Sequence, residues 1–135
     1  MNQYLNQASH NKNFLNCVEA NFDDRFFDWK ITITFYIAIH LLKALAKERK
    51  KNIGDTHHEI ANSLDASRCA KPVMQFPPNI WKAYKRLFDY SKSSRYDGIV
   101  DHNIQELAKQ ADYKQVTLLF TSFKSYMDSQ KITIS

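Results

Sequence analysis

An arginine and a histidine stand close together late in the chain, in the segment RYDGIVDH that runs from Arg95 to His102. The planar guanidinium of an arginine suits phosphate oxygens, because its N–H groups match their geometry. A neutral imidazole can take a proton from a ribose 2′-hydroxyl, and a protonated one can give a proton to a leaving oxygen. Together the two groups can divide the cleavage of a phosphodiester bond between them, with the guanidinium stabilising the developing charge and no metal required.

Simpler interpretations of these residues stay open. Arg95 could instead pair with Asp97 or Asp101, or cap the carbonyl groups at a helix end. Tyr96 could stack on a base or simply pack against the protein. An arginine and a histidine at this separation also arise often by chance, so the pair alone does not identify an enzyme.

The segment WKITITFYIAIHLLKAL, residues 29–45, is apolar nearly all the way around a helix and predicts a buried central helix. One stripe at helical spacing differs, because it carries an indole, a phenol and an imidazole. Its members are Trp29, Ile33, Tyr36, His40, Lys43 and Lys47. A buried imidazole needs hydrogen-bond partners, so we expect His40 to point at one, either in a core network or in a functional cleft.

Three further histidines lie at predicted helix starts. His57 and His58 are at the start of a short helix, and His102 is at the start of the last one. The positive end of the helix dipole at such N-termini favours the binding of anions. No histidine pair has the i, i+4 spacing of a metal-binding helix, and Cys17 and Cys69 lack the spacing of a metal clip. We therefore expect no metal and no other cofactor, and we expect both cysteines to be reduced.

The bulk composition predicts one helical domain in a cytoplasm. The chain has 135 residues, 44% of them hydrophobic, with 2 Gly and 3 Pro. The longest apolar run is about ten residues, too short to cross a bilayer, and the polar N-terminus predicts no secretory signal. The net charge of +5 comes from clustered cations. They are compatible with a nucleic-acid partner, although the helix dipole also favours cations at a helix C-terminus.

The patterns predict a single domain over residues 1–135, folded as an all-α bundle of four long helices and one short one. The predicted helices cover residues 2–22, 28–51, 57–64, 78–94 and 101–129, with a frayed start over 1–13 and a flexible tail over 131–135. The expected N-caps are Asp28, either Asp55 or Thr56, and for the last helix either Asp101 or Asn103. Two apolar stripes on the last helix indicate packing on a wide face, including contact with a second copy of the chain. The first stripe is Ile104, Ala108, Ala111, Leu118, Leu119, Ser122 and Tyr126, and the second is Val116, Phe120, Phe123 and Met127.

The order of these motifs resembles the small bacterial branch of the HEPN superfamily (higher eukaryotes and prokaryotes nucleotide-binding). The similarity covers residues 14–128 and rests on DWKITITFYIAIHLL, then THHE, then YKRLFDYSKSSRYDG and the long last helix. It implies an up-and-down bundle of four or five helices, often a homodimer, and a metal-independent ribonuclease of a toxin–antitoxin, phage-defence or RNA-processing system.

The resemblance also implies roles for individual residues. Arg95 and His102 match the catalytic arginine and histidine of the superfamily, and Tyr96 stands where a polar residue often follows the arginine. Positions that support the site or bind substrate are matched by Tyr36, His40, and His57 or His58. If such a site exists, we expect Tyr36, His40 and Arg95 to converge on one cleft that takes RNA or a nucleotide.

A second class of function is open, because other members of the superfamily have lost catalysis. These serve as dimerising modules that bind a partner protein, such as a nucleotidyltransferase. A third interpretation is a structural helical protein whose polar stripe makes only internal hydrogen bonds. None of the three interpretations requires a membrane.

Overall fold

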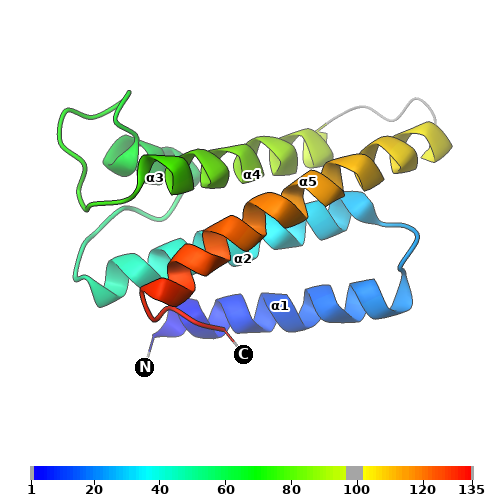
Figure 1. The fold of residues 1–135 in the computed structure, drawn as a ribbon, viewed down its shortest axis with the longest axis horizontal. Helices are drawn as coiled ribbons and strands as arrows, with labels where there is room; N and C mark the ends of the chain where they lie inside the picture. The colour runs from blue at the N-terminus through cyan, green and yellow to red at the C-terminus, as the bar shows by residue number, and fades with distance from the viewer. Residues whose placement is uncertain (1, 97–101, 135) are drawn as a thin grey trace.

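A computed structural model describes the backbone of residues 2–96 and 102–134, and the side chains of residues 2–94 and 106–134. Over these ranges the protein has five helices and no strand, which confirms the all-α prediction (Figure 1). The helices are α1 (Gln3–Asn21), α2 (Phe27–Glu48), α3 (His57–Leu64), α4 (Pro78–Tyr96) and α5 (His102–Ser129). Each long helix runs antiparallel to the next long helix along the chain.

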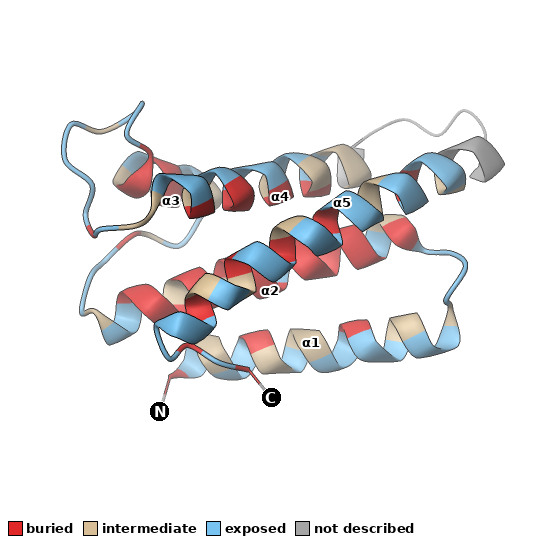
Figure 2. Cartoon of the chain, in the orientation of Figure 1, coloured by how far each residue is buried: buried red, intermediate tan, exposed pale blue. Residues whose placement is uncertain are grey.

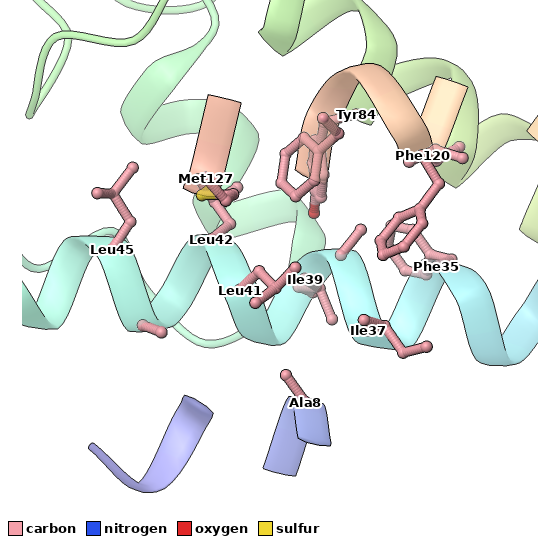
Figure 3. Close-up of a cluster of buried hydrophobic side chains, with 14 of the residues drawn as sticks. Ala8, Phe35, Ile37, Ile39, Leu41, Leu42, Leu45, Tyr84, Phe120 and Met127 are labelled. Carbon is pink, nitrogen blue, oxygen red and sulfur yellow. The ribbon is translucent and has the colours of Figure 1, made fainter. Parts of the chain in front are cut away.

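Helix α2 lies at the centre of the bundle, as its all-round apolar pattern predicts. It packs against α1 on one side and against α4 and α5 on the other, while α4 and α5 also pack on each other. Figure 3 shows side chains from the other long helices around α2: Ala8 from α1, Tyr84 from α4, and Phe120 and Met127 from α5. The short helix α3 lies beside α4 and covers the aromatic part of this core.

The length of α2 corrects the expectation about membrane segments. The uninterrupted apolar run is short, but the whole helix has 22 residues and a mean hydropathy of 1.3 in its most apolar window, enough to cross a bilayer by length and composition alone. Within the bundle, 78% of that window is buried. This is the burial expected of the core helix of a small soluble-like domain.

Both chain ends are packed more firmly than the sequence predicts. Asn2 caps α1, since its Oδ1 accepts hydrogen bonds from the backbone N–H groups of Tyr4 and Leu5. Its Nδ2 donates to the Ala44 carbonyl at 3.0 Å, which ties the predicted frayed start to α2. The predicted flexible tail instead buries Ile132 and Ile134 in the core, because Lys131 adopts a left-handed conformation (φ 64°) that turns the chain back onto the bundle.

The start and end of α2 also differ from prediction. Asp28 does not cap the helix; Phe26 occupies the N-cap position with no side-chain hydrogen bond, and Asp28 falls in the first turn, where the dipole favours an acid. The helix ends at Glu48 rather than near Lys51, because Lys50 adopts a left-handed conformation (φ 56°). The cap of α3 is as predicted, with Thr56 Oγ1 accepting from the Glu59 N–H at 3.1 Å.

The two apolar stripes of α5 have different surroundings. The second stripe is buried, with Val116, Phe123 and Met127 fully enclosed. The first stripe is divided in its described part: Leu118 is 64% exposed, whereas Leu119 and Tyr126 pack partly against the core. Leu107, one turn from Ala111, is 68% exposed and extends the same outer face, which is largely pale blue in Figure 2. The described part of the bundle therefore leaves an apolar surface on α5 uncovered.

Candidate functional site at the junction of α4 and α5

The predicted catalytic pair flanks the junction between two packed helices. Arg95 belongs to the last turn of α4, and His102 is the first residue of α5. The side chains of Arg95, Tyr96 and His102, together with residues 97–101, lie outside the described part of the structure. The pairing of the guanidinium with the imidazole therefore stays a prediction, and the described side chains around the junction define its surroundings.

The interior beneath this junction is polar. Ser91 on α4 is fully buried, and Lys109 on α5 is only 5% exposed. The Lys109 ammonium lies 3.5 Å from Ser93 Oγ and 3.8 Å from the Asp112 carboxylate. Burying a charge is costly unless partners compensate for the lost water, so a lysine here is unusual in a small core.

Two more polar atoms are buried nearby. Ser94 Oγ and Glu106 Oε2 are shielded from solvent and have no hydrogen-bond partner among the described residues. Buried polar atoms are nearly always paired in folded proteins, and both residues adjoin positions 95–105, whose side chains lie outside the described part of the structure.

The sequence carried a signal for this cluster that our interpretation missed. Lys109 lies seven residues before Val116 and fourteen before Phe123, and therefore shares their buried stripe. A lysine on an otherwise apolar stripe is the pattern that predicts a buried cation.

A hollow of about 420 Å³ opens between α4 and α5 beside this cluster. Its lining includes Ser93 and Asp112, the two residues that Lys109 contacts. Arg86, Asp89 and Tyr90 complete it. The hollow thus brings solvent, and anything dissolved in it, to the edge of the buried polar cluster.

His57 is part of an aromatic core rather than an open site. Its ring stacks on Phe88 with 3.5 Å between ring centroids and 7° between planes, and its Nδ1 lies 3.1 Å from the Tyr84 hydroxyl. Burial, followed by the positive charge of Arg68, lowers the pKa of His57 to about 4, so the imidazole is neutral at pH 7. Burial also raises the pKa of the Tyr84 phenol, which keeps its proton and can donate it to Nδ1. The neighbouring His58 is exposed, with Nε2 3.2 Å from Asn62 Nδ2.

The polar stripe of α2 is not buried as a whole, which corrects the expectation of a buried imidazole. Trp29 is 60% exposed and Tyr36 is 43% exposed, while His40 is half-buried. The stripe follows an edge of α2 that the other helices leave partly open, and its far end meets α1, where the Lys43 ammonium lies 5.9 Å from the centroid of the Tyr4 ring.

His40 binds its own helix. Its Nδ1 lies 2.7 Å from the Tyr36 carbonyl oxygen, and since a carbonyl only accepts, Nδ1 carries the proton in this contact. Burial lowers the pKa of His40, with the Tyr36 carbonyl opposing and the Lys43 ammonium adding to the effect. In the neutral ring, Nε2 is therefore the acceptor nitrogen.

The described contacts do not join His40, His57 and His58 into one cleft. Within the described side chains, no hydrogen bond or ring contact links His40 with His57 or His58. The expected convergence of Tyr36 and His40 with Arg95 involves a side chain outside the described part and stays a prediction. Among the described residues there is also no group of three or more His, Cys, Asp or Glu side chains placed to hold a metal ion.

Comparisons of the chain with models of known protein families, with curated proteins and with solved structures find no match. The assignment of function therefore depends on the geometry of the chain and on the motifs in its sequence.

Proposed function

We propose that this chain is a cytoplasmic RNA-acting protein of the HEPN kind, with metal-independent endoribonuclease activity centred on Arg95 and His102. The observation that supports this proposal best is the buried polar cluster at the α4–α5 junction, where Lys109 is enclosed beside Ser93 and Asp112. Replacing a buried charge together with all of its partners by apolar side chains is often neutral or stabilising, so stability alone does not favour such a cluster.

Helical spacing relates the predicted pair to this cluster. Arg95 follows the buried Ser91 by four residues, and His102 precedes the buried Lys109 by seven. Residues at these separations share a helix face, so in the proposal both positions continue the stripes of Ser91 and Lys109. In the proposal, the cluster forms the floor of the site and the hollow between α4 and α5 provides access to it.

The proposed reaction is a transesterification within RNA. The neutral imidazole of His102 takes the proton of a ribose 2′-hydroxyl, and the 2′-oxygen forms a bond to the adjacent phosphorus. The bond from phosphorus to the 5′-oxygen breaks, and that oxygen receives a proton from water or from the imidazolium. The products are a 2′,3′-cyclic phosphate and a 5′-hydroxyl. The guanidinium of Arg95 stabilises the extra negative charge on the non-bridging oxygens.

The test is cleavage of end-labelled single-stranded RNA by the purified chain in the presence of EDTA. We expect cleavage by the native chain and a loss of about 10²-fold or more in His102→Ala and Arg95→Ala. Arg95→Lys should restore little activity, because an ammonium lacks the planar fork. His10→Ala, which removes an exposed histidine on α1, is the matched control and should cleave normally. Absence of cleavage, or equal cleavage by all variants, would contradict the proposal.

A second candidate is a non-catalytic module that dimerises and binds a partner protein. The outward apolar face of α5, with Leu107 and Leu118 both more than half exposed, favours it. This candidate predicts a dimer by light scattering, leaves added RNA intact, and predicts that Leu118→Glu yields a monomer. A native chain that is monomeric at high concentration would contradict it.

A further inference from the structure

A basic groove lies at the opposite end of the bundle from the α4–α5 junction, where α2 ends beside the start of α1 (Figure 1). The hollow has a volume of about 420 Å³. Four lysines line it: Lys43, Lys47, Lys50 and Lys51. Among the described residues its lining includes one carboxylate, Asp55, so the positive charge is in clear excess.

No described carboxylate neutralises the charge of these lysines. Over the described ranges, no ion pair joins any of the four to a carboxylate, whereas Lys85, Lys109 and Lys124 elsewhere each have an acidic partner. Clustered like charges in a concave surface concentrate the positive potential and attract anions. The helix dipole explains a cation such as Lys47 in the last turn of α2, but its effect fades within that turn and does not account for Lys43.

The backbone at Lys50 gives a second, independent observation. Lys50 has φ 56°, in the left-handed region, at the position just after a helix where glycine is usual. The turn is closed by the Lys51 N–H, which donates to the Ala46 carbonyl at 2.9 Å. Glycine would form this turn without the steric cost of a Cβ. The chain nevertheless places a lysine there, on the lining of the groove.

A larger hollow of about 1030 Å³ lies beside the groove, and Lys51 lines both. This second hollow adds the Lys71 ammonium and the half-buried rings of Phe76 and Tyr126, which lie edge to face at 5.3 Å. Arg49 also lines it, but its guanidinium is occupied by the Gln75 carbonyl, Tyr126 Oη and Gln130 Oε1, so we assign it to the structure of the wall. We call the two neighbouring hollows together the basic path; lysines line both, and the rings of Phe76 and Tyr126, which pack partly on the core, form part of the wall of the second.

We infer that this path binds the phosphate backbone of single-stranded RNA, away from the proposed cleavage site. A basic groove that follows the backbone, with aromatic rings on which bases stack, is the general design of single-strand binding surfaces. Two adjoining hollows suit several successive phosphates rather than one nucleotide. Their concave shape suits a strand better than the flat surface of a membrane. The inference deepens the proposed function, because it names a second surface for the same class of ligand.

The experiment measures binding of a fluorescent single-stranded oligouridylate of about twelve nucleotides by anisotropy, in EDTA, with His102→Ala as the parent so that the RNA stays intact. Lys50→Gln/Lys51→Gln in that parent should weaken binding about tenfold at about 0.15 M salt and lower the slope of log K against log salt by about 1.4. Lys82→Gln/Lys114→Gln removes the same charge from exposed positions on α4 and α5 and should change affinity less than about twofold.

Equal affinities of the two double variants would overturn the inference, as would tighter binding to vesicles of anionic phospholipid than to RNA. If the proposed ribonuclease function fails but the groove binds RNA, the native chain leaves RNA intact while the lysine variants still lose binding. Conversely, RNA cleavage could depend on His102 while the lysine variants bind RNA normally. That result would support the ribonuclease proposal and contradict the proposal that the groove binds RNA.

Discussion

The two ends of the bundle hold their positive charges in opposite ways. At the α4–α5 end, Lys109 is enclosed and contacts Ser93 and Asp112. At the α2 end, Lys50 and Lys51 are exposed, and within the described ranges neither has an acidic partner. A buried charge costs several kcal/mol that internal partners must offset, whereas an exposed charge costs little and acts through solvent.

This contrast fits the two tasks proposed for the chain, phosphodiester chemistry and the binding of a polyanion. Chemistry on a phosphodiester needs groups held in fixed positions away from water, where electrostatic interactions are strong. Capture of a polyanion needs accessible charges that act over about 10 Å, the screening length at about 0.1 M salt.

The largest expected effect is the removal of the buried ammonium. Lys109→Met keeps the apolar stem but removes the contacts with Ser93 and Asp112, so we expect the free energy of unfolding to fall by about 1–3 kcal/mol. Lys51→Met at the other end should change it by less than about 0.5 kcal/mol. Urea denaturation of both variants at pH 7 checks the pair. Similar losses of unfolding free energy in the two variants would show that Lys109 and Lys51 contribute equally to stability, which contradicts the contrast between the two ends.

A pH effect of intermediate size is expected between the ends, at His57. The pKa of His57 is about 4 in the folded chain and 6.5 for a free imidazole, so the unfolded chain binds the proton first on acidification. Stability is therefore unaffected above about pH 6.5 and falls progressively toward pH 4. The loss is about 1–2 kcal/mol, because the half-exposed imidazole is partly screened by water.

The measurement for this effect is urea denaturation at several pH values between 7 and 4.5. His57→Gln cannot titrate, so the difference in stability between it and the native chain should shrink as the pH falls. His10→Ala, which removes an exposed histidine, should follow the native curve. A His57→Gln curve parallel to the native one over the whole range would show that His57 does not cause the loss.

A smaller effect of opposite sign is expected at the basic end. Lys50→Gly relieves the left-handed conformation at φ 56° and should raise the free energy of unfolding by about 0.5–1 kcal/mol. The same substitution removes one cation from the groove and should weaken RNA binding. A variant that melts higher and binds RNA less well separates the role of this lysine in binding from its cost in stability. Unchanged binding would leave the left-handed lysine without a functional reason.

The sequence predicted those parts of the fold that depend on a regular period. The apolar pattern of α2, the Thr56 cap and the buried stripe of Val116, Phe120, Phe123 and Met127 each follow from local spacing, and the structure confirms them. Tertiary contacts decide the rest. Asn2 holds the chain start through a carbonyl on α2, and Ile134 is buried because the chain turns back at Lys131. No window of sequence contains both partners of such contacts.

Around the candidate site, too, tertiary contacts that the sequence does not reveal decide which side chains are buried. Lys30 and Lys109 are both almost fully enclosed, although each is a lysine and lysines are rarely buried. Lys30 donates a hydrogen bond to the Phe22 carbonyl at the end of α1, which compensates its charge with a group eight residues away. In contrast, exposure of the α2 stripe depends on which edges the neighbouring helices leave open, and helical period alone does not determine this.

The smallest effect is expected at His40, where the polar stripe of α2 leads toward the basic groove. Its imidazole is half-buried and donates to the Tyr36 carbonyl of its own helix, a group that already accepts the helical hydrogen bond of residue 40. His40→Ala therefore leaves no buried group unpaired and gains helix propensity, so we expect a change in unfolding free energy within about 0.5 kcal/mol. Because the lowered pKa keeps the ring neutral at pH 7, RNA binding through charge should also be unchanged.

A loss of unfolding free energy above about 1 kcal/mol would instead identify His40 as a buried hydrogen-bonding hub. A loss of RNA cleavage with normal stability and binding would extend the proposed catalytic site from the α4–α5 junction to α2.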